Sequence, residues 1–274
     1  MSRRVSLVLM PFHAATAEVG MGRGPRELVD RHGLAQAVGA AEIREIAAAP
    51  EIEHEVARTF ELDRRLAAAV RDAVAASRFP LVLAGNCISC LATAAGADAD
   101  GVLWLDAHAD FDTPDDNVSG FLDVMALAIL TGNAWHAQHA SIDASRPIEE
   151  RNVVLVGVRD LFDYQRLRLQ HSQIRLLTGS AGLEDALDAL AGRVRRLYLH
   201  VDLDCLDPSQ GRANQYAAPG GLTTAELQSA IGAAFDRFDV CAAALTAYDP
   251  AVDADGTLAA NAVAVATEIA RRAA

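Results

Sequence analysis

Short, continuous apolar runs alternate along the chain with longer segments in which apolar residues recur every three or four positions. Apolar runs without polar interruptions are typical of parallel strands covered on both faces, and the wider spacing is typical of helices. The predicted strands span residues 5–10, 41–46, 79–84, 101–106, 152–158, 173–177, 196–202 and 240–247. The predicted helices span residues 25–38, 54–77, 88–96, 121–132, 162–170, 181–191, 223–236 and 257–273.

The alternation of strand and helix predicts the fold class. It indicates a three-layer α/β/α architecture with a central, mainly parallel sheet of about eight strands. We expect a single domain over residues 1–274, because no repeat or long linker interrupts the pattern. Thr223 and Glu226 form a capping-box pair at the start of one predicted helix. In sheets of this kind, functional sites form beyond the carboxyl ends of the strands.

Composition and charge narrow the classes of function. The chain has 274 residues, of which 51% are hydrophobic and 22% charged, which is enough apolar material for a large core. The formal net charge is −13 and the basic residues are scattered, so no nucleic-acid partner is expected. No apolar stretch approaches the roughly 20 residues that span a bilayer, so no membrane association is expected. Without a secretory signal, the four cysteines are expected to be thiols of a cytoplasmic protein.

Two predicted strands end in closely spaced carboxylates. "LWLDAHADFD" presents Asp106, His108 and Asp110, and "RLYLHVDLDCLDP" presents Asp202 and Asp204. Residues two apart on an extended segment point the same way, so each set can converge on one point. A lone pair of strand-end aspartates would more simply face water. Here convergence of several carboxylates requires a cation, and oxygen ligands with one imidazole suit Mn²⁺ better than Zn²⁺.

These motifs resemble the two metal motifs of the arginase–agmatinase, or ureohydrolase, family. The resemblance is carried by "DAHADFD" and "HVDLDCLDP", and it extends over nearly the whole chain. Further landmarks occur in the family's order: "GMGRGPREL" (20–28), "LAGNCIS" (83–89), "SGFLDVMA" (119–126), "GVRDLFD" (157–163) and "TAYDP" (246–250). The resemblance implies an arginase-like fold, two Mn²⁺ ions, and hydrolysis of a small guanidino amino acid by a hydroxide held between the metals.

The resemblance also implies a role for each matching residue. By position, Asp106 and Asp202 would bridge both ions. His108 and Asp204 would complete the shell of one ion. Asp110 would belong to the other ion and to the catalytic machinery.

The first departure from the family is Cys87, which falls where the family has a metal-binding histidine. A thiolate can hold a metal, and we favour this interpretation. Cys87 could instead be a small buried residue beside a weakly held ion. A third possibility is a redox pair with Cys90 in "CISC".

Further departures lie in the loop of residues 119–126. Ser119 keeps its place and is a candidate for substrate binding. Phe121 replaces an asparagine that contacts an amino-acid carboxylate in the family. Asp123 replaces the histidine that shuttles protons, so we assign Asp123 to catalysis.

The remaining departures concern the substrate's two ends. Ala247 stands where the family has the glutamate that binds the guanidinium group, which leaves Thr246 and Tyr248 as candidates. The carboxylate that holds the α-amino group in the family is displaced here, so Asp160 or Asp163 must serve. His200, two residues before Asp202, could support a ligand, although a strand histidine with satisfied hydrogen bonds is the simpler expectation.

The departures shape the expected reaction. A thiolate ligand weakens the Lewis acidity of an ion, and arginine keeps a strongly basic guanidinium. The departures resemble the branch of the family that hydrolyses Nω-hydroxy-L-arginine to hydroxyurea and L-ornithine in the biosynthesis of the antibiotic D-cycloserine. The alternatives are an arginase, an agmatinase or another guanidino-compound hydrolase, a one-zinc amide hydrolase, and a non-catalytic module with a degenerate metal site. Self-association is left open.

Overall fold

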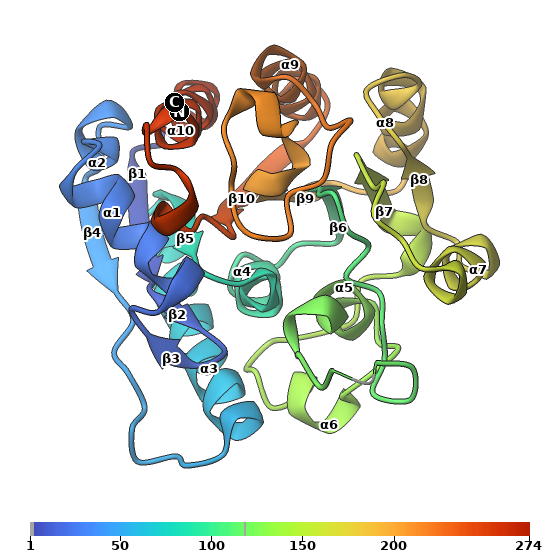
Figure 1. Cartoon of the computed structure of the whole chain (residues 1–274), viewed down its shortest axis with the longest axis horizontal. Helices are drawn as coiled ribbons and strands as arrows, with labels where there is room; N and C mark the ends of the chain where they lie inside the picture. The colour runs from blue at the N-terminus through green and yellow to red at the C-terminus, as the bar shows by residue number, and fades with distance from the viewer. Residues whose placement is uncertain (1–2, 118) are drawn as a thin grey trace.

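The chain forms three layers, with one parallel sheet between two layers of helices (Figure 1). The computed structural model describes residues 3–117 and 119–274. Every pairing in the eight-stranded sheet is parallel. The strand order is β4 (Glu42–Glu45), β1 (Val5–Met10), β5 (Phe79–Ala84), β10 (Asp239–Thr246), β9 (Arg196–Asp202), β6 (Gly101–Leu105), β7 (Val153–Val156) and β8 (Arg175–Leu177). The predicted fold class is confirmed.

The helices divide between the two faces of the sheet (Figure 1). One face is covered by α1 (Gly24–Asp30), α2 (Leu34–Ala37), α8 (Leu183–Ala191), α9 (Thr224–Phe235) and α10 (Thr257–Ala273). The other is covered by α3 (Glu55–Ala75), α4 (Cys90–Gly96) and α5 (Ala126–Leu130), with α6 (His136–His139) and α7 (Asp163–His171) beside them. Among the described residues, no helix is long and apolar enough to cross a membrane.

Alternate residues of each central strand enter two separate cores. In β5, Leu81 and Leu83 belong to the core beneath α9 and α10, whereas Val82 and Ala84 belong to the core beneath α3 and α4. All six residues of β5 are buried, which explains why the strand appears as an unbroken apolar run in the sequence. Thr223 and Glu226 form the predicted capping box of α9.

Several local differences separate the structure from the predicted elements, among them the short helix α6, which was not predicted. The helix predicted over 25–38 breaks into α1 and α2 at Gly33, whose φ of 65° is left-handed. The helix predicted over 121–132 begins as a 3-10 turn, Asp123–Met125, before α5. A two-stranded hairpin of β2 (Phe12–His13) and β3 (Thr16–Ala17) was not predicted, because two-residue strands carry no measurable periodicity.

Asp63 in α3 is a buried carboxyl group whose cost to stability can be measured. It is fully buried, and neither of its oxygens has a hydrogen-bond partner among the described residues. Burial, reinforced by the charge of Asp123, raises the pKa of Asp63 well above its usual value. The folded state therefore retains a proton that the unfolded state releases above about pH 4. As the pH rises from there, the free energy of the unfolded state falls relative to that of the folded state, so stability falls.

We therefore expect Asp63→Asn to stabilise the metal-free protein at pH 8 but not at pH 4. The asparagine has the same shape and no proton to lose. Each pH unit between the two pKa values is worth about 1.4 kcal/mol. Urea unfolding at both pH values measures the effect. The control is Asp72→Asn, an exposed position on the same helix, where a change within about 0.5 kcal/mol is expected. Equal stability of wild type and Asp63→Asn at pH 8 would contradict the prediction.

Candidate metal centre

The predicted ligands meet at the carboxyl ends of the four central strands. β5, β10, β9 and β6 are neighbours in the sheet, and their ends lead into the segments that carry Cys87, Ala247, Asp202 and Asp106. A cavity of about 430 Å³ opens there. It is lined by Met21, Cys87, His108, Asp110, Phe121, Asp123, Val124, Asp202, Asp204, Asn214, Tyr216 and Ala247.

The first group of possible metal donors comprises Asp106, His108 and Asp204. Their donor atoms all lie within 4.8 Å of one another. His108 Nδ1 is 3.4 Å from both Asp106 Oδ1 and Asp204 Oδ2. Two neighbouring side chains hold the carboxylates: Trp104 Nε1 donates to Asp106 Oδ2 at 2.9 Å, and Asn214 Nδ2 donates to Asp204 Oδ2 at 3.1 Å. The orientations of these ligands are therefore fixed by the fold.

The electrostatics of the cavity favour a bound cation. Burial, together with neighbouring carboxylates, raises the pKa values of Asp110 and Asp202 well above their usual range. Burial opposes a charge on His108, but hydrogen bonds with Asp106 and Asp204 raise the pKa of that imidazole to about 12. Without a nearby cation, the buried carboxylates therefore favour protonation, either of themselves or of His108. Divalent cations would meet the same need, so the donor set fits a metal centre.

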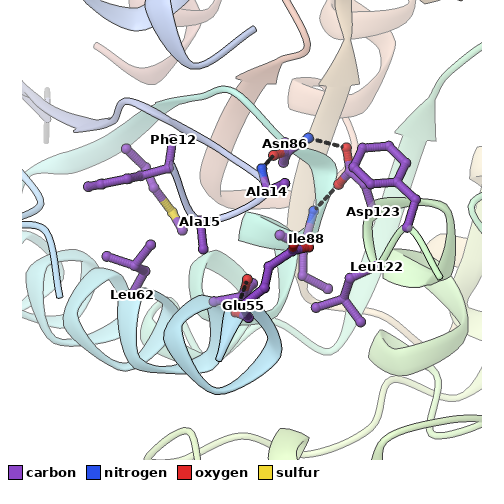
Figure 2. Close-up of a pocket in the computed structure, with 12 residues that line it drawn as sticks. Phe12, Ala14, Ala15, Glu55, Leu62, Asn86, Ile88, Leu122 and Asp123 are labelled. Atoms are coloured by element: carbon purple, nitrogen blue, oxygen red, sulfur yellow. Dashed lines mark hydrogen bonds between the residues drawn. The ribbon is translucent and has the colours of Figure 1, made fainter. Parts of the chain in front are cut away.

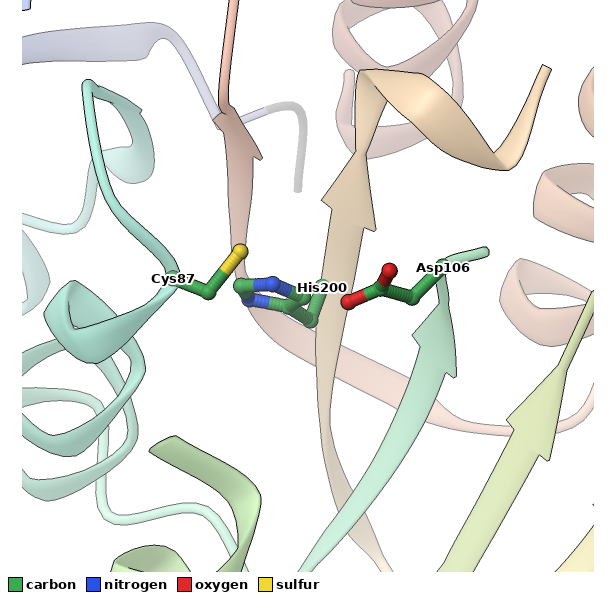
Figure 3. Close-up of side chains that lie close together, drawn as sticks. All are labelled: Cys87, Asp106 and His200. Carbon is green, nitrogen blue, oxygen red and sulfur yellow. The ribbon is translucent and has the colours of Figure 1, made fainter. Parts of the chain in front are cut away.

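The second group of possible donors comprises Cys87, Asp106 and His200, whose donor atoms also lie within 4.8 Å of one another (Figure 3). Cys87 is buried in the turn after β5, and its Sγ lies 3.0 Å from Asp202 Oδ2 and 3.1 Å from Thr246 Oγ1. Burial and the surrounding carboxylates raise the pKa of the Cys87 thiol well above its usual value. A thiolate here therefore requires a cation beside it.

The other interpretations of Cys87 have structural counterparts. Cys87 and Cys90 are both free thiols in this structure. Cys90 Sγ donates to the carbonyl oxygen of Ala126 at 3.7 Å and packs in the core between α4 and α5. Only Cys87 of the two lines the cavity among the described residues. The role of Cys87 as a ligand stays a prediction.

His200 differs from the simple expectation for a strand histidine. It is fully buried, and its ring stacks on Trp104 with 3.7 Å between ring centroids. Nδ1 lies 2.7 Å from the Tyr198 hydroxyl, but Nε2 has no hydrogen-bond partner among the described residues. Burial lowers the pKa of His200 to about 3, so the ring is neutral. The expectation that its hydrogen bonds are all satisfied is wrong for Nε2.

Asp123 lines both this cavity and a second hollow of about 380 Å³, whose lining Figure 2 shows. Its Oδ1 accepts from the Ile88 amide at 2.8 Å, and its Oδ2 accepts from Asn86 Nδ2 at 2.5 Å. Burial raises the pKa of Asp123 to about 7 although these hydrogen bonds oppose the shift. Phe121 also lines both cavities, so the loop of residues 119–126 separates them.

Three candidates for substrate binding are exposed and do not belong to the cavity lining. Ser119 is exposed, and its hydroxyl donates to Asn117 Oδ1 at 2.6 Å. The Asp160 side chain is 64% exposed, with Oδ2 3.8 Å from His108 Nε2, so it stands at the rim beside a predicted ligand. Asp163 is exposed at the first residue of α7. Their contacts with substrate stay predictions.

The two candidates beside Ala247 are buried. Thr246 faces Cys87, as described above, and Tyr248 donates its hydroxyl to Asp253 Oδ2 at 3.0 Å. Ala247 itself lines the cavity and adopts a left-handed φ of 65°. At this position the cavity wall therefore offers a methyl group where the family resemblance implies a carboxylate.

Sequence reasoning missed several residues that shape the site. Asn214 links Asp204 to the Ala247 carbonyl oxygen, to which its Nδ2 donates at 3.0 Å. It comes from an irregular loop that carries no periodic pattern. Asp112, the last acidic residue of the first motif, accepts hydrogen bonds from side chains of α7, Tyr164 and Gln165. It therefore anchors α7 and does not line the metal cavity.

Comparison with known proteins agrees with this geometry. A family model described as "Arginase family" matches residues 3–271. An arginase of Bacillus caldovelox is 31% identical over 217 residues, which cover 75% of this chain and 73% of that protein. An arginase of Bacillus subtilis (strain 168) is 25% identical over 276 residues, covering 92% and 93%.

Solved structures show the same likeness. The native arginase of Bacillus caldovelox has a TM-score of 0.85 at 26% identity, with 98% of each chain covered. Proclavaminate amidino hydrolase from Streptomyces clavuligerus has a TM-score of 0.72 at 18% identity, covering 99% of this chain and 91% of that one, which is a likeness of fold alone.

A parallel sheet whose central strands end in a buried cluster of carboxylates, imidazole and thiol places the chain among α/β proteins with a candidate metal centre at the carboxyl edge of the sheet. Within that class, the chain belongs to the arginase family. Members of this family are hydrolases that act on guanidino carbon–nitrogen bonds of small substrates and depend on two metal ions. The predicted family and enzyme class are confirmed.

Proposed function

We propose that this protein is a binuclear manganese amidinohydrolase that converts Nω-hydroxy-L-arginine and water into hydroxyurea and L-ornithine. This is the reaction of the hydroxyarginine hydrolase in D-cycloserine biosynthesis. The observation that carries the proposal is the pairing of Cys87 in the metal cluster with Ala247 on the cavity wall. A thiolate ligand from Cys87 would weaken the Lewis acidity of the ion that it binds. Ala247 offers no carboxylate to pair with the charged guanidinium of arginine.

We assign the ligands from the two donor groups. Asp106 and Asp202 would be shared by both ions, His108 and Asp204 would hold one ion, and Cys87 with Asp110 would hold the other. Oxygen-rich donor sets suit Mn²⁺, which supports manganese over zinc. When bound, two divalent ions would supply Lewis acidity and make water available as a nucleophile near neutral pH.

The lining of the cavity supports a hydroxylated guanidine as substrate. An N-hydroxyguanidino group is less basic than the guanidino group of arginine, so it is more often neutral. It therefore depends less on a carboxylate partner at position 247. Met21, Phe121 and Val124 form apolar walls around the acidic floor. These walls would exclude water from the guanidino carbon and hold the methylene chain of an amino acid.

The chain's own residues then have distinct tasks. Water adds to the guanidino carbon, and the bond from that carbon to the chain nitrogen breaks, so that nitrogen must gain a proton to leave as the amine of ornithine. Asp110 and Asp123 are the carboxyl groups that we assign to proton transfer. Ser119, with Asp160 or Asp163, would hold the α-carboxylate and α-amino groups at the rim, and Thr246 and Tyr248 would support the wall around Ala247.

The second candidate substrate is arginine, because the curated relatives are named arginases. Product analysis separates the two. Manganese-loaded protein is offered Nω-hydroxyarginine, arginine and agmatine at equal concentrations, and hydroxyurea, urea, ornithine and putrescine are quantified. We expect hydroxyurea and ornithine to dominate, with chelator-treated protein inactive. Arginine hydrolysed as fast as its hydroxylated form would contradict the substrate, and activity in chelator would contradict the metal mechanism. Cytoplasmic location, self-association and the absence of nucleic-acid and membrane partners stay predictions.

If Cys87 is a ligand, bound metal should protect its thiol from alkylation. Metal-free and manganese-loaded proteins are treated with iodoacetamide, and labelling at each cysteine is measured by mass spectrometry. Cys241 is the matched control, because it is equally buried but lies on β10 away from the cavity. We expect metal to slow labelling of Cys87 by at least about 10-fold and to leave Cys241 unchanged. Equal labelling of Cys87 in both states would make it an ordinary buried thiol.

A further inference from the structure

The starting observation is the unpartnered nitrogen of His200. A buried polar atom without a hydrogen bond destabilises the folded state, so such atoms are rare in native proteins. His200 Nε2 is such an atom among the described residues, and the ring is fully buried. It lies on β9 two residues before Asp202, so both side chains point to the same face of the sheet.

The surroundings of this ring contain two further metal donors. The imidazole lies between Cys87 Sγ and the Asp106 carboxylate (Figure 3), and one ring nitrogen, the sulfur and a carboxylate oxygen are mutually within 4.8 Å. Donor atoms that share one ion lie about 3 to 4.5 Å apart, because each bond is about 2.0 to 2.3 Å long. Small side-chain adjustments therefore suffice to bring sulfur, nitrogen and oxygen onto one ion.

The hydrogen bonds behind the ring leave Nε2 free to bind. His200 Nδ1 lies 2.7 Å from the Tyr198 hydroxyl oxygen, which can accept the Nδ1 proton. In that tautomer the lone pair of the ring is on Nε2, the nitrogen without a hydrogen-bond partner among the described residues. The stacked Trp104 ring fixes the plane in which that lone pair points.

We propose that His200 Nε2 is a direct metal ligand, so that one ion is held by Cys87, His200 and Asp106. The inference rests on the proposed metal function and deepens it. The family resemblance implies a metal-binding imidazole at position 87. Here β9 would supply an imidazole through His200, and Cys87 would bind the same ion through sulfur. The second ion keeps the group of Asp106, His108 and Asp204, so the two groups share Asp106. The two ions would then differ in chemistry, one with a sulfur donor and one without.

The direct test is nuclear magnetic resonance of wild-type protein labelled with ¹⁵N-histidine and loaded with ¹¹³Cd²⁺, a diamagnetic ion that accepts sulfur, nitrogen and oxygen donors. Scalar coupling between ¹¹³Cd and ¹⁵N occurs only through a bond. We expect coupling to two imidazoles, one lost in His108→Gln and the other in His200→Gln. Coupling to a single imidazole that disappears in His108→Gln would overturn the inference. Because the wild type carries the signal, the test does not depend on a variant that folds poorly.

A titration with Co²⁺ supplies the quantitative test. The thiolate-to-cobalt absorption follows the ion beside Cys87. His200→Gln removes a direct ligand and should lower the affinity for this ion by at least about 100-fold. Loss of a group that only supports a ligand lowers metal affinity by about 10- to 100-fold. Tyr198→Phe, which removes such a support, should fall in that lower range. His139→Gln is the matched control, because His139 is also buried but lies in α6 outside the cavity; it should change nothing.

The outcomes separate this inference from the proposed function. Unchanged affinity and spectrum in His200→Gln would overturn the ligand role and leave a two-metal hydrolase intact. Thiolate absorption that is absent in the wild type would overturn the sulfur–nitrogen–oxygen set. Failure of the wild type to bind two equivalents of any divalent ion, counted by elemental analysis, would overturn the proposed function itself.

Discussion

Asp202→Asn should lower kcat/KM by at least about 10⁴-fold, because it neutralises the carboxylate that we assign to both ions and would weaken the binding of the ions that activate water. The structure adds a second reason: Asp202 Oδ2 lies 3.0 Å from Cys87 Sγ, and Oδ1 accepts from the Asp204 amide at 2.7 Å. The asparagine side chain is neutral, so it cannot make these contacts and also offset the charge of a cation. Steady-state kinetics and metal counting by elemental analysis measure the change.

The control for this variant is Asp185→Asn. Asp185 is an exposed aspartate on α8, far from the cavity lining. It should retain full activity and both metal ions, so a loss seen only in Asp202→Asn reflects the site. Asp202→Asn protein that binds two ions and keeps more than about a tenth of its activity would contradict the assignment of Asp202 as the shared ligand.

Cys87→His should narrow the protein's discrimination between Nω-hydroxyarginine and arginine. In the wild type we expect a preference of about 100-fold in kcat/KM, which corresponds to about 2.7 kcal/mol. A neutral imidazole donates less charge than a thiolate, so the ion becomes a stronger Lewis acid and arginine becomes a better substrate. The preference should fall below about 10-fold. Kinetics with both substrates on both proteins measure the ratio.

A second substitution and a control sharpen this result. Asp123→His restores the side chain that shuttles protons in the family and should raise the turnover of arginine. It should not alter the Lewis acidity of the ions, because Asp123 is not among the assigned ligands. Cys241→Ala removes an equally buried thiol whose Sγ donates to the Leu197 carbonyl oxygen, outside the cavity, and should leave the ratio unchanged. A Cys87→His protein with the wild-type ratio would show that the thiolate does not set substrate choice.

Most of the fold could be predicted because both faces of the sheet are covered. A strand such as β5 must then be apolar at every position, and such a run is visible in one sequence without any relatives. Where burial is absent, the pattern weakens: β4 is exposed along its length, so its four residues do not form an unbroken apolar run. Turns such as Ala14 and Ala15, both with positive φ, depend on contacts that sequence pattern does not record.

The candidate site was predictable only as far as it is local. Asp106 and His108 are brought together by their own spacing, so their sequence was sufficient. The place of His200 depends instead on register, because it faces Trp104 across the β6–β9 pairing. Whether Nε2 of the ring finds a hydrogen-bond partner is decided by neighbouring side chains from three different segments, which the local sequence does not reveal. Asn214 likewise reaches Asp204 through the path of a loop.

The left-handed backbone at Ala247 has a consequence for how this scaffold can change its substrate. A side chain in this conformation costs roughly 1–2 kcal/mol relative to glycine, and the chain already bears that cost with a methyl group. Exchanging the methyl for a longer side chain adds no further backbone strain, because φ is already 65°. Evolution, or a protein engineer, can therefore reintroduce a carboxylate at the cavity wall with one substitution. Recognition of the guanidino group is in this sense separable from the stability of the fold.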